Sequence, residues 1–241
     1  MTEHADTDLA WLDEIPALPW DDLEVAHDVN LAILRRAARP RVLSTLLDRV
    51  RCDPDLFAMA EHFDNIDQIV LYDALDRGFR IRLHLYPDQA FDRPHDHRWP
   101  LTNLIVHGRI GHELHRPRPP ADVSSGLEVS TPTTIWEAEA EAAYTLDHRS
   151  IDSVVTGADT VALLMRGPSR TDSFTMADRT TGRVWTRRGR ALETPEEIEA
   201  KRMTTDRFDS LLARLAEFGL LDEPQPADRR RDGALPVVRQ P

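Results

Sequence analysis

The sequence predicts a mainly β fold, a sandwich or barrel with helices at both ends of the chain. From Ile66 to about Trp185 apolar residues tend to alternate with polar ones, which is the pattern of strands with one buried face. These stretches are short and are separated by proline, glycine and aspartate clusters, as in sandwiches and barrels. We expect strands at residues 68–72, 79–86, 101–107, 110–115, 134–144, 151–155, 160–166 and 173–177.

Helical patterns precede the barrel. Residues 1–20 are rich in acids and proline and are expected to form a flexible arm. Residues 21–65 repeat apolar positions at helical spacing, and Pro40 and Pro54 stand where successive helices would begin. We expect these helices to cover one end of the barrel domain, residues 66–190.

A second helical region follows the barrel, at residues 191–220. Thr194 and Glu197 can form a capping box with a proline between them, which marks a helix start. A helix at 206–218 has one apolar stripe and is expected to pack on the barrel. Residues 221–241 are rich in proline and arginine, and we expect them to be disordered.

The composition limits the classes of function. With 241 residues, 41% of them hydrophobic, the chain can bury one sizeable core. The formal net charge of −12 argues against nucleic acid as a partner, because phosphate binding needs a basic surface. No apolar run approaches the roughly 20 residues that span a bilayer, and the acidic N-terminus lacks a secretory signal. The lone Cys52 fits a reducing compartment, so we expect a cytoplasmic protein without a membrane partner.

The most informative motif is Pro94-His95-Asp96-His97. Side chains alternate faces along an extended chain, so His95 and His97 point the same way and Asp96 points the opposite way. Two imidazoles on one face supply half of a metal site. If a barrel brings His148 across to them, three neutral nitrogens can hold a divalent metal and leave its opposite side free.

The other histidines are expected to be solvated or to pack in the core. His112 and His115 are separated by an odd number of positions, so a regular strand places them on opposite faces and makes them a poor pair of ligands. We therefore leave both of them, together with His107, out of the predicted metal site.

The residues of this motif resemble the cupin superfamily. Its first motif has two histidines separated by one residue and then a strand that ends in glycine, as in His95, His97 and Gly108. Its second motif supplies one more histidine on a later strand, for which His148 is the downstream candidate. The resemblance covers roughly residues 66–185 and implies a jelly-roll barrel, the double-stranded β-helix. Within the superfamily the chain is most similar to the three-histidine thiol dioxygenases typified by cysteine dioxygenase.

The chain departs from the usual cupin pattern at the carboxylate ligand. Most metal cupins carry a glutamate a few residues after the second histidine, where this chain has Trp-Pro-Leu-Thr-Asn at 99–103. That absence favours an all-histidine triad of the thiol-dioxygenase type. Asp96 is a carboxylate close by in the sequence, but it points away from its neighbours in a regular strand. The cysteine that some thiol dioxygenases crosslink to a tyrosine is absent as well.

The second predicted strand has one apolar face and one polar face, and the polar face contains Arg82, His84 and Tyr86. Amphipathic strands usually turn such a face to solvent, whereas the family resemblance turns it toward the metal. In the second case the resemblance implies that Arg82 and Arg166, joined by Asn103, bind a substrate carboxylate. Tyr86 or His84 would then orient O2 or the substrate.

Three functions fit these residues. The leading hypothesis is a mononuclear non-haem Fe(II) oxygenase, a dioxygenase acting on a small carboxylate-bearing amino acid or thiol-like substrate. The second is a non-redox cupin in which zinc, nickel or manganese serves as a Lewis acid in an isomerase, lyase or hydrolase. The third is a cupin without turnover that binds a small molecule. Cupin-like sheets often pair through an edge strand, so a homodimer is one expected assembly.

Overall fold

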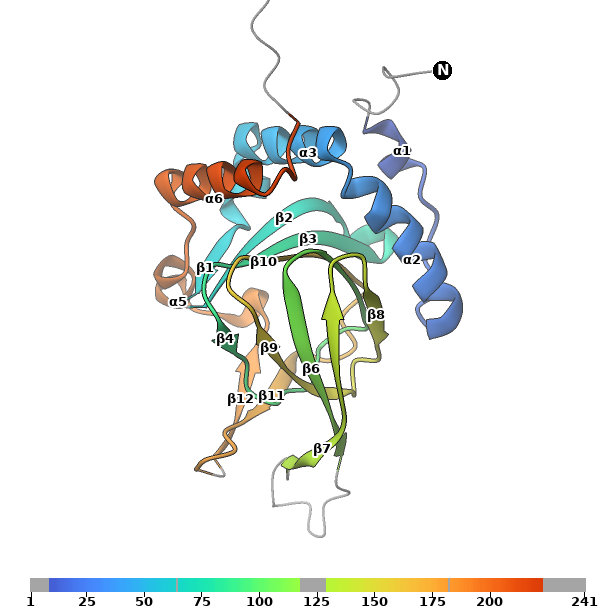
Figure 1. Ribbon diagram of the computed structural model, residues 1–241, viewed down its shortest axis with the longest axis vertical. Coiled ribbons are helices and arrows are strands. Elements are labelled where there is room, and N and C mark those ends of the chain that lie inside the picture. The colour runs from blue at the N-terminus through green and yellow to red at the C-terminus, as the bar shows by residue number, and fades with distance from the viewer. Residues whose placement is uncertain (1–8, 64, 118–128, 182, 223–241) are drawn as a thin grey trace, which may run out of the picture.

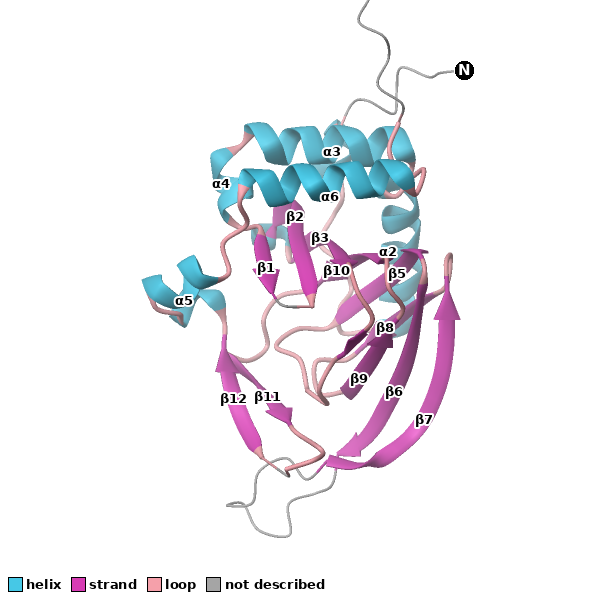
Figure 2. Cartoon of the chain, turned by 60° about the vertical axis from the view of Figure 1, so that its left-hand side comes forward, coloured by secondary structure: helices cyan, strands magenta, loops and turns pink. Residues whose placement is uncertain are grey.

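The computed structural model describes residues 9–63, 65–117, 129–181 and 183–222. The helices are α1 (Ala10–Asp13), α2 (Leu23–Ala37), α3 (Pro40–Cys52), α4 (Pro54–Ala58), α5 (Pro195–Ala200) and α6 (Thr205–Glu217), with 3-10 turns η1 (Leu75–Arg77) and η2 (Arg190–Leu192). The strands are β1 (Glu61–Phe63), β2 (Ile66–Ala74), β3 (Phe79–Tyr86), β4 (Ala90–Phe91), β5 (Leu101–His107), β6 (Arg109–Pro117), β7 (Val129–Glu139), β8 (Ala143–Leu146), β9 (Ile151–Thr156), β10 (Thr160–Arg166), β11 (Ser173–Ala177) and β12 (Val184–Arg188). Helices α2, α3 and α6 lie together on one side of the strands (Figure 1 and Figure 2).

The strands from β3 to β10 form a jelly roll. The larger sheet has the order β1-β2-β3-β10-β5-β8 and the smaller sheet the order β4-β9-β6-β7. Neighbouring strands are antiparallel, and the chain passes back and forth between the sheets so that β3-β10-β5-β8 faces β4-β9-β6-β7. This is the double Greek-key order of a jelly roll. The predicted mainly β, cupin-type fold is confirmed.

Most strands lie where the alternation of polar and apolar residues predicts them. Strands β3, β5, β10 and β11 have the predicted bounds, because each is a short alternating or apolar stretch between turn residues. The predicted strand at 134–144 is two strands: β7 ends at Glu139 and β8 begins at Ala143. Glu141, with a φ of 74°, occupies the turn between them. The strands β1 and β4 carry too few residues to show a period and were not predicted, and β12 was not predicted either.

The main hydrophobic core lies between the helices and the outer face of the larger sheet. Ile81, Leu83 and Leu85 of β3 point into this core together with Leu163 and Met165 of β10, and all five side chains are at most 1% exposed. Full burial of such a side chain is worth about 1.5–3 kcal/mol. Because side chains alternate along a strand, the residues between them face the interior of the barrel.

Residues 9–20 are packed on the molecule, which corrects the expectation of a flexible arm for this stretch. Its acidic and proline-rich composition conceals apolar side chains that reach the main core. The buried side chains are Leu12, Ile15, Leu18 and Trp20. The rest of the predicted arm, residues 1–8, and residues 223–241 of the predicted tail lie outside the described residues.

The predicted helix starts are found at their expected positions. Pro40 and Pro54 are the first residues of α3 and α4. Thr194 caps α5, where its hydroxyl accepts from Glu197 N at 3.2 Å and Glu197 Oε2 accepts from Thr194 N at 2.8 Å. Phe208 of α6 is fully buried in the main core, so this helix joins the helical layer. In the described part of the chain no helix combines the length and the apolar character needed to cross a membrane.

The turn between β5 and β6 requires glycine for two reasons. Gly108 has a φ of 76°, and a Cβ on it would lie 2.9 Å from Thr160 Cα. We expect Gly108→Ala to lower the free energy of unfolding by about 3 kcal/mol, from backbone strain and overpacking together. Gly78 has a similar φ of 86° but open space around the added Cβ, so Gly78→Ala should lower it by about 1 kcal/mol. Urea denaturation of both variants checks this difference, and equal losses would contradict it.

Candidate metal centre

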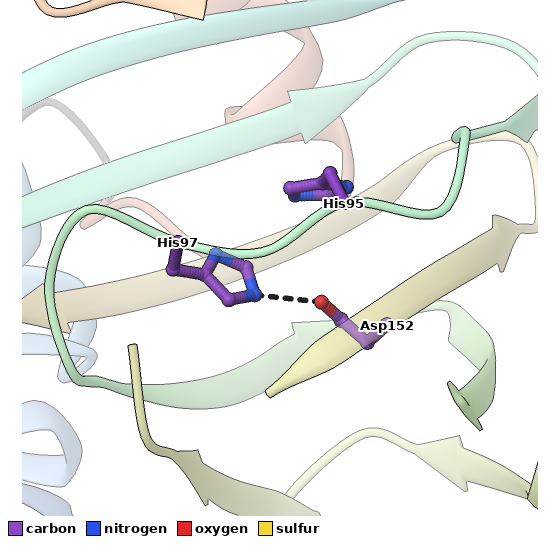
Figure 3. Close-up of side chains that lie close together, drawn as sticks. All are labelled: His95, His97 and Asp152. Atoms are coloured by element: carbon purple, nitrogen blue, oxygen red, sulfur yellow. Dashed lines mark hydrogen bonds and ion pairs between the residues drawn. The ribbon is translucent and has the colours of Figure 1, made fainter. Parts of the chain in front are cut away.

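Three side chains on the inner face of the barrel bring their ligand atoms together (Figure 3). In the described part of the chain, ligand atoms of His95, His97 and Asp152 all lie within 4.8 Å of one another. Nε2 of His97 is 2.6 Å from Oδ1 of Asp152. The histidines come from the segment between β4 and β5, and the aspartate comes from β9, so the group joins two parts of the chain that are distant in sequence.

The backbone explains why both histidines face this point. His95 N donates to Asp152 O at 2.9 Å, and Asp152 N donates to His95 O at 3.0 Å, which holds the segment extended beside β9. His95 and His97 therefore share a face, as their spacing predicts. Asp96 points the opposite way, where its Oδ1 accepts from Thr175 N at 2.6 Å. The Asp96 carboxylate is thus hydrogen-bonded to the backbone of β11, and Asp96 is not part of the group.

The His95 ring is oriented by the backbone. Its Nδ1 lies 2.8 Å from Arg93 O, and because a carbonyl can only accept, Nδ1 carries a proton and Nε2 is the ring nitrogen left to bind a metal. This arrangement fixes the tautomer and direction of a metal-binding imidazole. Burial disfavours the charged ring, but the carboxylates of Asp92 and Asp152 outweigh burial and raise the pKa of His95.

Asp152 is held between two imidazoles. Its Oδ1 faces His97, and its Oδ2 accepts from Nε2 of His112 at 2.6 Å. Burial alone would raise the pKa of Asp152, yet the charge of His97 and the hydrogen bonds from His112 and His97 lower it far below its ordinary range. Asp152 is therefore an ionised carboxylate 3% exposed to solvent, which is the charge and oxygen donor that a divalent cation requires.

The residues present fit a mononuclear divalent ion. Imidazole nitrogen and carboxylate oxygen bind Fe(II), manganese and zinc with bonds of about 2.0–2.2 Å. Two ligand atoms at right angles around such an ion are about 3 Å apart, so the 2.6 Å between His97 Nε2 and Asp152 Oδ1 has to widen by only a few tenths of an ångström. The ionised state of Asp152 needs no change, whereas the proton that His97 Nε2 donates to Asp152 Oδ1 must leave that nitrogen before it can bind a metal.

His148, the third predicted ligand, lies outside this group. It follows β8 in a turn, where its carbonyl accepts from His97 N at 2.9 Å and its Nδ1 is 3.3 Å from Asp147 Oδ2. Its role as a ligand stays a prediction. Sequence reasoning missed Asp152, although a sign was available: an acid within the apolar strand β9 shares a face with Val154, two residues on, and Val154 is buried between the sheets.

The polar face of β3 points into the barrel and not to solvent. Leu164 of β10 pairs with Arg82 across the sheet, and it packs with Leu101 and Leu146 inside the barrel. Leu114 of the opposite sheet touches the same cluster, so this cluster lies between the two sheets. Because residues that pair across a sheet share a face, Arg82 and its polar neighbours on β3 line the interior.

Two arginines inside the barrel have no counter-ion among the residues that the structure describes. Arg82 and Arg166 form no ion pair with a described carboxylate, and Nε of each is buried without a hydrogen-bond partner among the described residues. Both guanidinium groups lie over the ring of Trp99, with Cζ 5.6 Å and 4.4 Å from its centroid, and Arg98 adds a third at 5.2 Å. Burial, reinforced by neighbouring arginines, lowers the pKa of Arg82 to about 10 and that of Arg166 to about 9. Both remain cations at neutral pH.

The remaining predicted site residues also line this interior. Asn103 Nδ2 donates to Tyr144 Oη at 2.9 Å, whereas its Oδ1 has no described partner. Nε2 of His84 is likewise buried without a partner, and burial together with the charge of Arg82 lowers the pKa of His84 to about 3, so the ring is neutral. Burial, with the nearby carboxylates of Asp92 and Asp152, raises the pKa of Tyr86. Its phenol keeps its proton.

Comparisons with known proteins find similar solved structures at low sequence identity. No family model and no curated protein matches the sequence. The structure is similar to KdgF from Halomonas sp. (14% identity, 46% of this chain and 84% of that one, TM-score 0.35) and to an RmlC-like cupin from Shewanella frigidimarina (12%, 46% and 86%, 0.34). It is also similar to a chain from the DMSP lyases RdDddP and RnDddQII (15%, 47% and 53%, 0.34). The identities are low and less than half of this chain is covered, so the strand order itself carries the fold assignment.

Proposed function

We propose that this chain is a mononuclear Fe(II)-dependent oxygenase that acts on a small carboxylate-bearing molecule inside the barrel. The observation that carries the proposal is the group of His95, His97 and Asp152. Two histidines and one carboxylate on one side of an ion, with the other side open, are the ligand set of non-haem Fe(II) oxygenases. The carboxylate replaces the third histidine of the original hypothesis, and the oxygenase class is unchanged.

Fe(II), when bound, supplies open coordination positions for O2 and substrate and the electrons for O2 activation. The protein supplies the rest. The Arg93 carbonyl orients His95, and the ionised Asp152 lowers the net charge at the ion. The phenol of Tyr86 is protonated, so it can donate a hydrogen bond to a ligand within the barrel. Neutral His84 can accept or donate one without adding charge.

The arginine pair supports the choice of an anionic substrate. A buried cation without a counter-ion is costly, and Arg82 and Arg166 share this position beside Trp99. A carboxylate can take up the planar N–H groups of guanidinium in paired hydrogen bonds. Asn103, with an unpaired amide oxygen, can accept a hydrogen bond from a hydroxyl or amine of the same ligand.

Metal analysis and O2 chemistry test the proposal. Protein purified without added metal should contain about one iron per chain, and anaerobic Fe(II) protein should bind nitric oxide, an O2 analogue, with a high-spin EPR signal. O2 uptake should then appear with one of a panel that includes cysteine, 3-mercaptopropionate and the common amino acids.

Two results would overturn the oxygenase. Stoichiometric zinc, nickel or manganese, with no nitric oxide signal after iron loading, would favour the non-redox cupin, since the same ligands suit Lewis-acid chemistry. Failure to bind any divalent metal would leave a cupin that binds a small molecule without turnover.

A further inference from the structure

We infer that His112 is a positioning residue that holds Asp152 as a one-oxygen ligand of the metal. The inference rests on the proposed metal centre and deepens it, because it concerns how many coordination positions remain for substrate. His112 was left out of the predicted site, and it is completely buried.

The order of the strands places Asp152 between the segment of His95 and His97 on one side and His112 on the other. On one side of β9 lies the segment of His95, which pairs with Asp152 through its backbone. On the other side lies β6, where Leu114 is the direct partner of Asp152 and His112 lies two residues away on the same face. The two carboxylate oxygens therefore point in different directions, Oδ1 toward His97 and Oδ2 toward His112.

The packing around the His112 ring restricts its rotation away from Oδ2 of Asp152. Its ring is 4.2 Å from that of Trp136, edge to face, and 4.5 Å from that of Tyr144, nearly stacked. Nε2 donates to Asp152, and Nδ1 has no hydrogen-bond partner among the described residues. A hydrogen bond to a charged acceptor is stronger than one between neutral groups. The packing of the His112 ring directs its Nε2 toward this acceptor, the Asp152 carboxylate.

This contact has a consequence for the metal. An aspartate with both oxygens free can turn them to one ion and occupy an additional position. With Oδ2 bound to His112, only Oδ1 faces the histidine pair, so that position stays available to a ligand. Groups that orient metal ligands in this way typically change metal affinity 10–100-fold when they are removed.

Variants of His112 separate positioning from packing. Gln places an amide N–H at the distance of Nε2, whereas Asn is too short to reach Oδ2 and Leu has no donor. We expect His112→Asn and His112→Leu to weaken Co(II) binding about 10–100-fold in calorimetric titration, and His112→Gln to stay within about threefold of the wild type. His115, a buried histidine on the outer face of the same strand, provides the control, and His115→Leu should leave Co(II) affinity unchanged.

The visible spectrum of the Co(II) protein gives a second measurement. The bands of the Asn and Leu variants should weaken, because a freed second oxygen raises the coordination number, and those of the Gln variant should match the wild type. Wild-type affinity and spectrum in His112→Asn would overturn this inference alone. A wild-type protein that binds no metal would overturn the metal centre as well, so the two failures are distinguishable.

Discussion

Asp152→Asn should abolish stoichiometric metal binding while leaving the fold intact. Asparagine has the same shape but no charge, so the site keeps two neutral imidazoles and loses the one anionic donor. We expect the dissociation constant for Fe(II) or Zn(II) to rise by more than about 100-fold. Elemental analysis and chelator competition measure this loss. Urea denaturation should show a decrease of about 1–3 kcal/mol from the weakened hydrogen bonds with His97 and His112.

His148→Ala is the informative companion of this variant. His148 stands in a turn, its Nδ1 near Asp147, and it is not among the gathered ligand atoms. The His148→Ala protein should therefore retain metal at the wild-type stoichiometry. The reverse pattern, with metal lost from His148→Ala and kept by Asp152→Asn, would restore the three-histidine site that the family resemblance implies and would remove Asp152 from it.

Arg166→Met should make the ligand-free protein more stable and remove its response to carboxylates. Arg166 is 5% exposed and has no described counter-ion. Methionine avoids the cost of burying that charge, and we expect a gain of about 1–3 kcal/mol, similar to the gain when a buried ion pair is replaced by apolar residues. A wild-type protein with ligand at 100 times its dissociation constant gains about 2.7 kcal/mol. Thermal unfolding with and without succinate should show this gain in the wild type and none in the variant.

The controls for Arg166→Met concern charge and location. Succinamide, which lacks the negative charges, and sodium chloride at equal ionic strength should not stabilise the wild type. Arg170 is partly exposed and pairs with Asp21, so Arg170→Met should keep the succinate response. If Arg166→Met responds to succinate as the wild type does, the carboxylate binds elsewhere and the arginine pair has another role.

The fold could be predicted well because its signals are local. The alternation in β3 and the apolar run of β10 mark strands that a helical layer covers on one side, and the prolines at 40 and 54 fix where helices begin. Residues 9–20 could not be predicted from composition, because the few apolar side chains among many acids decide how this stretch packs. The turn at Glu141 was hidden because a single residue with positive φ interrupts an otherwise regular alternation.

The candidate site could be predicted only in part because its third ligand depends on register. The spacing of His95 and His97 fixes their common face by local geometry alone. Asp152 joins them because β9 runs beside this segment and places the residue directly opposite His95, which no local pattern encodes. A search for a third histidine led to His148, which is four residues from the position that the register brings into line.

His112 was excluded by an argument that was correct but too narrow. Its spacing from His115 does place the two on opposite faces of β6, so they cannot act as a pair. The argument did not consider each histidine alone with a partner on another strand. The inward one, His112, meets the carboxylate of Asp152, and the outward one lies beside Ser153.

Because the helices and the larger sheet share one core, we do not expect the barrel to fold without the helices. Ile81, Leu83 and Leu85 pack against the helical layer, so a fragment that begins at the first strand would expose a large apolar surface to water. Such a fragment should aggregate. The segments before and after the barrel therefore fold together with it, and grafting this jelly roll into another protein would require including its helices.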